Sequence, residues 1–432
     1  MTSSNTNGLK TDHADVRFIS SSYGGTDPHQ SAIQLILAVR PEWASDDSKI
    51  EFARFTDGIT NTLLKAVNKK EGWTKEQVDA EAILLRAYGS GTAVLIDRER
   101  EAQNHELLSK HGLAPELLAR FNNGMLYRYI KGSVTSPDDL RKPAIYCAVA
   151  GRLAEWHATV PCIQQAKPAS NGASHQQSNG NGTSNGNGAG HEDRQIVIDN
   201  VAPGKPPPNV WTVMQKWIFA LPDTTAEQKA RQRTLQVELD SLVEQLSQRP
   251  GLGVNGLVFA HCDLLSGNVI ILPGQPGDVE GAKSVTFIDY EYATPSPAAF
   301  DLANHFAEWG GFDCDWSVMP TRAQRQTFIT KYIESYFASQ QSEVDHEAEV
   351  TKLMDEVDLF RGVPGFYWGI WALIQATISD IDFDYASYAE TRLSEYWAWK
   401  AESDGSRAAA GPNKPRREKA MGARTNSQIA LL

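Results

Sequence analysis

The chain has 432 residues, of which 41% are hydrophobic and 22% charged, and its 41 basic and 53 acidic residues give a net charge of −12. This apolar content is enough for a buried core, and at roughly 100–200 residues per domain the length fits two or three lobes. The acidic balance argues against nucleic acid or an anionic membrane as a general partner, because both require a basic surface.

The cysteines and the N-terminus favour the cytoplasm. The four cysteines include no Cys-x-x-Cys pair, which argues against a structural zinc site, and their small number fits a reducing compartment. Residues 1–17 contain no apolar stretch of the signal-peptide type. The most apolar run, residues 366–378, is shorter than the about 20 residues that a membrane-spanning helix needs. We therefore expect a cytoplasmic protein without a transmembrane segment.

The sequence pattern of the N-terminal third predicts a small lobe of strands around one helix. Residues 1–20 are polar and are predicted to be a disordered tail. Residues 21–131 contain the apolar runs 32–38 and 50–55, predicted strands at 82–87 and 124–130, and a predicted helix at 97–110. This layout is typical of an α+β lobe.

Residues 132–402 predict a larger and mostly helical lobe. Helical patterns cover residues 140–160, 235–246 and most of 300–400, and short strands are expected at 257–260, 269–272 and 285–288. Between 163 and 205 the chain is rich in Ser, Asn and Gly and is predicted to be a disordered insert. Residues 403–432 are polar, partly basic and predicted to be a second disordered tail.

The densest chemical signal is a His-x-Asp-x4-Asn pattern between two predicted strands. It consists of His261, Asp263 and Asn268, and Asp289 ends the next strand. This arrangement matches the phosphoryl-transfer machinery of kinase-like folds, in which the first Asp accepts the substrate's hydroxyl proton. The Asn and the second Asp hold Mg²⁺, a hard cation that prefers oxygen ligands. The alternative, that these are ordinary turn residues, must explain the spacing and the strands together.

Two neighbours of Asp263 are predicted to have structural roles and no catalytic one. We expect His261 to brace the loop and not to act as an acid or base. We expect Cys262 to pack in the interior, because nothing in the sequence orients it as the nucleophile of a Cys–His pair.

An arginine inside a predicted strand is the second signal. Arg86 interrupts the apolar run 82–87, where a charge is costly unless it is paired. A guanidinium can contact phosphate oxygens and a carboxylate together, and Glu101 is the candidate carboxylate, with Glu99 and Glu106 as competitors. The alternative is a surface arginine on an edge strand. The turn at 57–61 could cap ATP phosphates through its backbone N–H groups, although it lacks the GxGxxG and Walker A patterns.

With these residues in view, the sequence resembles the choline/ethanolamine kinase family. The matching segments are FTDGITNTLLKA (55–66), ILLRAYGSGTAVLIDRERE (83–101), HGLAPELLARFNNGMLYRYIKG (111–132), HCDLLSGNVI (261–270), FIDYEYATPSPAAFDLANHFAEWGG (287–311) and YWGIWALIQATISDIDFDYASYA (367–389). The resemblance implies an α+β, two-lobed protein-kinase-like fold, with ATP and Mg²⁺ as cofactors. FTDGITN and the leucine pair 264–265 lean toward the ethanolamine branch of the family.

The resemblance also implies roles for the site residues. Asp263 would be the catalytic base, and Arg86 would contact phosphate with Glu101 as its partner. Thr60 and Asn61 would lie in the phosphate loop. Asn268 and Asp289 would be magnesium ligands, with Glu291 nearby.

The family's amino-alcohol pocket corresponds here to Glu308, Trp368, Trp371, Tyr385 and Tyr388. Such a pocket also makes physical sense, because aromatic faces and one carboxylate can hold a small cation. Trp368 and Trp371 are three residues apart, so they share one face of a helix. The alternative is that they are core aromatics. Glu308 between Phe306 and Trp309 is either paired or functional.

Two positions depart from the family's pattern. Cys262 stands where the family usually has asparagine, which we expect to change loop packing without loss of activity. Residues 363–365, Val-Pro-Gly, replace an Ala-Ser-His type sequence, and because proline is unsuited to a helix interior we expect the following helix to begin later.

The resemblance implies transfer of the γ-phosphoryl group of MgATP to the hydroxyl of ethanolamine, the first step of phosphatidylethanolamine synthesis. The main rival is a choline kinase or a dual choline/ethanolamine kinase. More remote rivals are a phosphotransferase for an aminoglycoside or another small alcohol, and a catalytically inactive kinase-fold binding module. The sequence leaves open whether the chain forms a homodimer.

Overall fold

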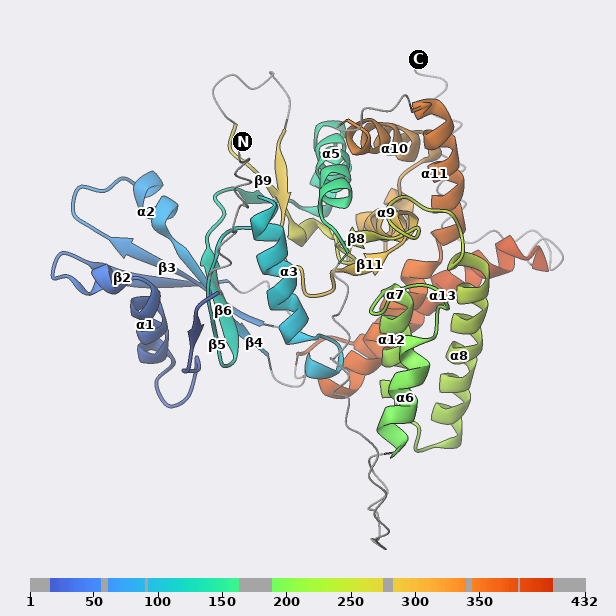
Figure 1. The fold of residues 1–432 in the computed structure, drawn as a ribbon, viewed down its shortest axis with the longest axis horizontal. Coiled ribbons are helices and arrows are strands. Elements are labelled where there is room, and N and C mark those ends of the chain that lie inside the picture. The colour runs from blue at the N-terminus through green and yellow to red at the C-terminus, as the bar shows by residue number, and fades with distance from the viewer. Residues whose placement is uncertain are drawn as a thin grey trace, which may run out of the picture. The chain divides into compact units, whose positions relative to one another are not determined.

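A computed structural model describes residues 16–55, 61–89, 92–162, 189–274, 283–338, 344–379 and 381–406. The chain divides into two compact units (Figure 1). The first comprises Met1–Ser90 with Pro115–Lys131, and the second comprises Gly91–Ala114 with Gly132–Leu432.

The first unit is built on one sheet with the strand order β1-β5-β6-β4-β3-β2. Neighbouring strands are antiparallel, except that β1 runs parallel to β5. The strands are β1 (Phe18–Ile19), β2 (Lys49–Phe55), β3 (Asn61–Lys69), β4 (Ile83–Tyr88), β5 (Leu117–Phe121) and β6 (Gly124–Arg128). The helices are α1 (Pro28–Val39) and α2 (Lys75–Glu81), with a 3₁₀ turn, η1 (Pro41–Ala44).

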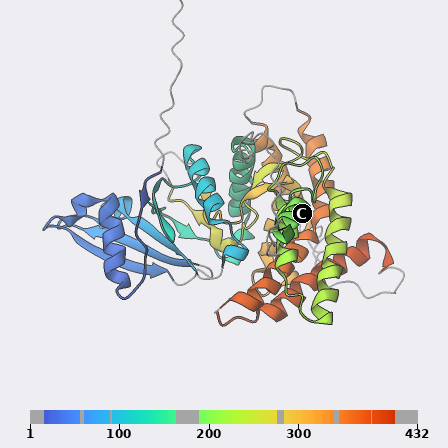
Figure 2. The same cartoon turned by 60° about the horizontal axis from the view of Figure 1, so that its bottom comes forward.

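One face of this sheet packs against α1 (Figures 1 and 2). Leu64, Leu85 and Leu126 stand opposite one another on β3, β4 and β6 and join Ile36 in this core. Because side chains alternate along a strand, Arg86 lies on the other face of β4. It is only 7% exposed, and its strand is paired on both sides, so the edge-strand alternative is wrong.

The second unit combines small sheets with many helices. Its strands pair in the orders β10-β9-β7 and β11-β8. They are β7 (Ser133–Val134), β8 (Val258–Ala260), β9 (Val269–Ile271), β10 (Val285–Phe287) and β11 (Thr294–Ser296). The helices are α3 (Arg98–Lys110), α4 (Pro137–Leu140), α5 (Pro143–Thr159), α6 (Ala189–Asp199), α7 (Val210–Ala220), α8 (Ala226–Leu246), α9 (Ala298–Ala307), α10 (Arg322–Tyr336), α11 (His346–Phe360), α12 (Val363–Ile378) and α13 (Tyr385–Ser403). The 3₁₀ turns are η2 (Thr92–Val94), η3 (Ser266–Asn268), η4 (Glu308–Gly310) and η5 (Trp316–Val318).

Several predicted boundaries need correction. The expected tail 1–20 contains β1, because residues 18 and 19 pair with β5. The expected disordered insert 163–205 contains α6, where the Ser/Asn/Gly-rich composition gives way to helix formers such as Glu, Arg and Gln. The expected single helix of the N-terminal lobe misses α1 and α2, and α3 belongs to the second unit. Residues 163–188 and 407–432 lie outside the described part.

Helix α12 begins at Val363, earlier than expected, because Pro364 occupies its first turn. Proline is tolerated there since the first N–H groups of a helix have no intrahelical acceptor. Helices α12 and α13 pack closely at glycine positions. A Cβ on Gly365 would lie 2.6 Å from the backbone oxygen of Arg392 and 3.1 Å from the Cβ of Glu395.

Among the described residues, no helix is both long and apolar enough to cross a membrane.

The close approach at Gly365 predicts a measurable loss of stability. We expect Gly365→Ala to lower the free energy of unfolding by about 1–3 kcal/mol, because the added methyl group must push the α13 backbone away. Gly151→Ala in α5 is the matched control, since its nearest neighbour would lie at 3.5 Å. It should gain up to about 1 kcal/mol from helix propensity. Urea denaturation of both variants checks this, and an unchanged or raised midpoint for Gly365→Ala would contradict the packing argument.

Candidate active site

The loop between β8 and β9 carries the predicted catalytic residue. Asp263 lies there with 8% of its surface exposed. The side-chain amide of Asn268 donates to the Asp263 backbone oxygen at 2.7 Å and to its Oδ2 at 3.1 Å. The structure thus brings together the Asp and Asn that the spacing predicted, and the amide fixes the orientation of the carboxylate.

A buried aspartate on the neighbouring helix holds this loop. Asp301 of α9 accepts the backbone N–H of His261 at 2.9 Å and that of Cys262 at 2.8 Å. The imidazole of His157 lies 3.0 Å from the same carboxylate. Burial by itself raises the pKa of Asp301, but interactions with His157 and, to a lesser degree, His261 together outweigh burial, so the pKa lies below its usual value. Asp301 is therefore a charged anchor for the turn that presents Asp263.

The anchor explains how Cys262 keeps an unusual backbone conformation. Its φ is +62°, in the left-handed region that asparagine tolerates better than cysteine. Its carbonyl oxygen accepts a hydrogen bond from Asn304 at 2.8 Å, and its thiol is buried near Ser296. Hydrogen bonds on both sides of the residue thus offset the strain, and the thiol only packs.

His261 braces the loop as its sequence position predicts. Its Nδ1 accepts the backbone N–H of Asp263 at 3.3 Å, so its Nε2 donates to the carbonyl oxygen of Ile288 at 3.0 Å. Burial lowers the pKa of His261 to about 4. The imidazole is therefore neutral at pH 7 and links the catalytic loop to the segment that follows β10.

Acidic groups gather around Asp263. Burial raises the pKa of Asp263 well above its usual value, and the hydrogen bond from Asn268 offsets only part of that rise. Negative charges raise it further, in decreasing order those of Asp289, Glu308 and Glu291. Asp289 itself has a φ of +66° two residues after the end of β10. Carboxylate and amide oxygens are the ligand types that Mg²⁺ prefers.

No group of three or more His, Cys, Asp or Glu side chains within the described ranges could hold a metal ion by itself. The predicted ligand set includes an asparagine amide, which is not among those residue types, so the set stays a prediction.

Arg98 connects two of the predicted acidic residues. Its guanidinium lies 2.8 Å from Glu101 and 3.0 Å from Glu291, and it donates to Thr92 at 2.6 Å. Glu101 is 3% exposed, whereas Glu106 pairs with Lys110 at the surface. Arg86 and Glu101 belong to different units, and their pairing stays a prediction.

The two predicted tryptophans lie together on α12. Their ring centroids are 5.5 Å apart in a T-shaped arrangement, and Tyr385 follows at 5.7 Å from Trp371. The indole N–H of Trp368 donates to Asn304, and that of Trp371 donates to the hydroxyl of Tyr292. Both tryptophans are therefore part of the core, and Trp368 is tied to the catalytic loop through Asn304.

The carboxylate predicted to bind the amino group is held by an arginine that the sequence analysis did not single out. Glu308 pairs with the fully buried Arg392 of α13 at 2.8 Å. The Arg392 guanidinium also lies 5.7 Å from the ring centroid of Tyr388. Two of the predicted pocket residues, Glu308 and Tyr388, thus both interact with the guanidinium of Arg392.

The phosphate-binding residues predicted in the first unit are only partly described. Arg86 is buried on the sheet face away from α1, and Asn61 begins β3. Thr60 lies outside the described residues.

A polar stripe on α9 is a signal that the sequence could have provided. Asp301, Asn304, His305 and Glu308 recur at helical spacing within an otherwise apolar segment. Each of them contacts the catalytic loop or the Arg392 cluster. Arg98 and Arg392 had no comparable signal, because arginines on charged helices are usually exposed.

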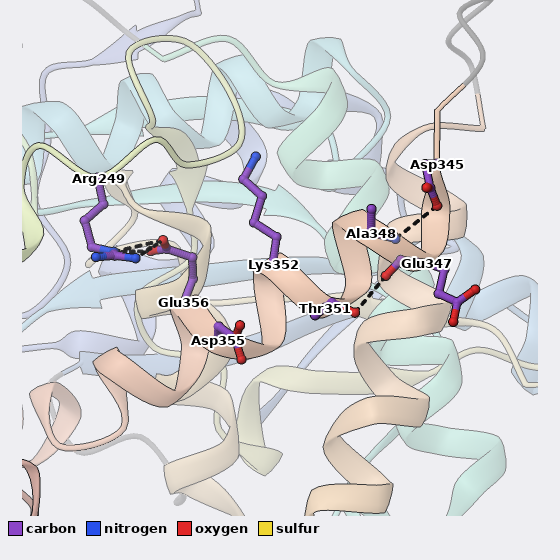
Figure 3. Close-up of a pocket in the computed structure, with 8 residues that line it drawn as sticks. All are labelled: Arg249, Asp345, Glu347, Ala348, Thr351, Lys352, Asp355 and Glu356. Carbon is purple, nitrogen blue, oxygen red and sulfur yellow. Dashed lines mark hydrogen bonds and ion pairs between the residues drawn. The ribbon is translucent and has the colours of Figure 1, made fainter.

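An open depression of about 540 Å³ lies on another part of the second unit, along α11 (Figure 3). Its lining includes Arg249, which pairs with Glu356. None of the predicted site residues lines this depression.

Comparisons with known proteins give the family. The sequence profile described as "Choline/ethanolamine kinase" matches residues 52–397. Ethanolamine kinase 1 of Mus musculus is 33% identical over 383 residues, covering 86% of this chain and 89% of its own. Ethanolamine kinase 1 of Homo sapiens is 33% identical over 385 residues, covering 86% and 72%. A solved Plasmodium vivax ethanolamine kinase has a TM-score of 0.62 at 24% identity, covering 86% and 89%. This likeness confirms the predicted protein-kinase-like fold.

The buried imidazoles predict how stability depends on pH. Burial lowers the pKa values of both His261 and His305 to about 4. Between pH 6.5 and 4 the unfolded chain therefore binds more protons at these sites than the folded chain, and the free energy of unfolding falls as the pH falls. Each imidazole should account for roughly 1–2 kcal/mol between pH 7 and 5.

His305→Gln isolates one of these contributions. In the native protein His305 Nδ1 donates to the Leu264 carbonyl and Nε2 accepts from Trp309, and an amide can fill both roles without titrating. Urea unfolding of both proteins at pH 7 and 5 checks the prediction. Parallel losses in the native protein and the variant would show that His305 is not the titrating group.

Proposed function

Since the chain belongs to the choline/ethanolamine kinase family, we propose that it transfers the γ-phosphoryl group of ATP to the hydroxyl of ethanolamine. The relatives that support this substrate are themselves named ethanolamine kinases. The enzyme is thus an ATP-dependent phosphotransferase with an alcohol as acceptor. Its product is phosphoethanolamine, the first intermediate on the route to phosphatidylethanolamine.

One structural observation carries the substrate assignment. Helix α9 holds the loop that presents Asp263 through Asp301 and Asn304, and Glu308 stands at the C-terminal end of the same helix. The charge of Glu308 is also one of the causes that raise the pKa of Asp263. Ethanolamine is a two-carbon molecule with a hydroxyl at one end and an ammonium group at the other. Asp263 can accept the hydroxyl proton while Glu308 accepts an N–H from the ammonium group. A short amino alcohol therefore matches the arrangement of these two side chains.

The chain's own residues position the acceptor. Asn268 orients the Asp263 carboxylate, and Asp301 and Asn304 fix the backbone that carries it. With its hydroxyl hydrogen-bonded to Asp263, the substrate is oriented for attack and its proton has an acceptor. Rate enhancement then depends on position and charge neutralisation more than on a specially tuned base.

Magnesium fits the acidic surroundings of Asp263. When bound, Mg²⁺ would neutralise charge on the phosphates of ATP. Asn268 and Asp289 are the proposed ligands, with Glu291 in the same site. Arg86, Thr60 and Asn61 are proposed to contact the phosphates, with Glu101 as the partner of Arg86. The cytoplasmic location and a homodimer remain predictions.

The aromatic side chains of the predicted pocket support choline as a second candidate substrate. Choline has no N–H donor on its quaternary ammonium and would depend on aromatic faces such as those of Trp371 and Tyr385. Glu308 favours ethanolamine, because its carboxylate can accept an N–H from a primary ammonium group.

Steady-state phosphorylation of ethanolamine and choline by the purified enzyme with MgATP tests the proposal. We expect kcat/KM to favour ethanolamine by about tenfold or more, which corresponds to about 1.4 kcal/mol of transition-state binding. Equal values would indicate a dual amino-alcohol kinase. No activity on either would overturn the substrate assignment in favour of another small alcohol or an inactive binding module.

Asp263→Asn tests the catalytic assignment. The variant keeps the size of the side chain but loses the carboxylate that accepts the proton, so we expect kcat to fall by about 10²–10⁴-fold. Asp355→Asn, an exposed change on α11, serves as the matched control and should keep its activity. A kcat for Asp263→Asn within about twofold of the native value would exclude Asp263 as the proton acceptor.

A further inference from the structure

The fully buried arginine beside Glu308 has no assigned role in the proposed reaction. Arg392 is 0% exposed, and its Nη2 lies 2.8 Å from Glu308 Oε1. Its Nε lies 3.7 Å from Glu395 on the same helix, and its guanidinium also contacts Tyr388 and the thiol of Cys314. Burying a guanidinium is expensive, so each of these partners constrains where it can lie.

The two carboxylate oxygens of Glu308 differ in their hydrogen bonding. Oε1 accepts from Arg392, while no described residue donates a hydrogen bond to Oε2. The carboxylate plane is thus fixed through one oxygen, and the other remains as an acceptor. A primary ammonium group has three N–H donors for such an acceptor, whereas a quaternary ammonium group has none.

The packing of α13 against α12 fixes the position of Arg392. Gly365 of α12 leaves room for the backbone oxygen of Arg392, as the 2.6 Å approach to a hypothetical Cβ shows. The packing therefore fixes the backbone of Arg392, and Glu308 fixes its guanidinium.

We propose that Arg392 is a positioning residue that determines the preference for a primary over a quaternary ammonium substrate. It holds one oxygen of Glu308 so that the other accepts an N–H from the substrate. This inference rests on the proposed function, because it assumes that Glu308 binds the amino group. The proposal differs from a merely structural role, in which loss of Arg392 would weaken the binding of both substrates equally.

Kinetics of Arg392→Met and Arg392→Lys with ethanolamine and choline, at saturating MgATP, test the proposal. Arg392→Met should raise the KM for ethanolamine about tenfold or more and change kcat by less than about threefold, because an interaction made on binding is lost. The KM for choline should change by less than about threefold, since choline donates no N–H. Arg392→Lys keeps the positive charge but loses the planar guanidinium with its several N–H donors. Its KM for ethanolamine should therefore lie between that of the native enzyme and that of Arg392→Met.

Two controls separate positioning from stability. Arg325 of α10 is also buried, at 4% exposure, and pairs with Asp358, so Arg325→Met should lower stability while keeping the ratio of the two KM values. In a Glu308→Gln background, Arg392→Met should change that ratio little further, because the two residues act as a unit.

The outcomes distinguish this inference from the proposed function. Equal KM increases for both amino alcohols in Arg392→Met and Arg392→Lys, or a full additional effect in the Glu308→Gln background, would overturn the positioning role alone. A native enzyme that phosphorylates neither amino alcohol would overturn the proposed function and this inference with it. If Arg392→Met does not fold, Arg392→Lys decides: an unchanged ratio of KM values would overturn the proposal.

Discussion

The active site depends on one buried carboxylate. Asp301 accepts two successive backbone N–H groups of the catalytic loop and a contact from His157, with no exposed surface of its own. A buried charge is stable only when its surroundings satisfy it, so this arrangement ties the loop conformation to the position of α9. The left-handed backbone at Cys262 is possible because the hydrogen bonds on both sides of it are already fixed.

Helix α9 connects the two halves of the chemistry within the second unit. Asp301 and Asn304 hold the loop that presents Asp263, and Glu308 at the helix end is the proposed acceptor for the amino group. Trp368 reaches the same loop through Asn304. One face of α9 thus both fixes the loop that carries the proton acceptor and carries the proposed ammonium-binding carboxylate. A helix holds such groups in position more precisely than separate loops would.

Carboxylates and arginines share the interior of the second unit. The charges of Asp289, Glu308 and Glu291 raise the pKa of Asp263, while Arg98 pairs with Glu291 and Arg392 pairs with Glu308. The proposed magnesium ligands and the proposed ammonium site both use members of this set, because carboxylate oxygens bind both kinds of cation.

The family, the kinase-like fold and the loop with Asp263 and Asn268 could be predicted from the sequence, because they depend on local spacing and on short strands with strong apolar patterns. The sequence did not reveal α6, the first turn of α12 around Pro364, or the pairing of Glu308 with Arg392, which is 84 residues away. The burial of Arg392 depends on contacts between distant parts of the chain. An arginine on a helix with charged neighbours is exposed by default, and only the packing of α12 against α13 removes it from water and brings it to Glu308.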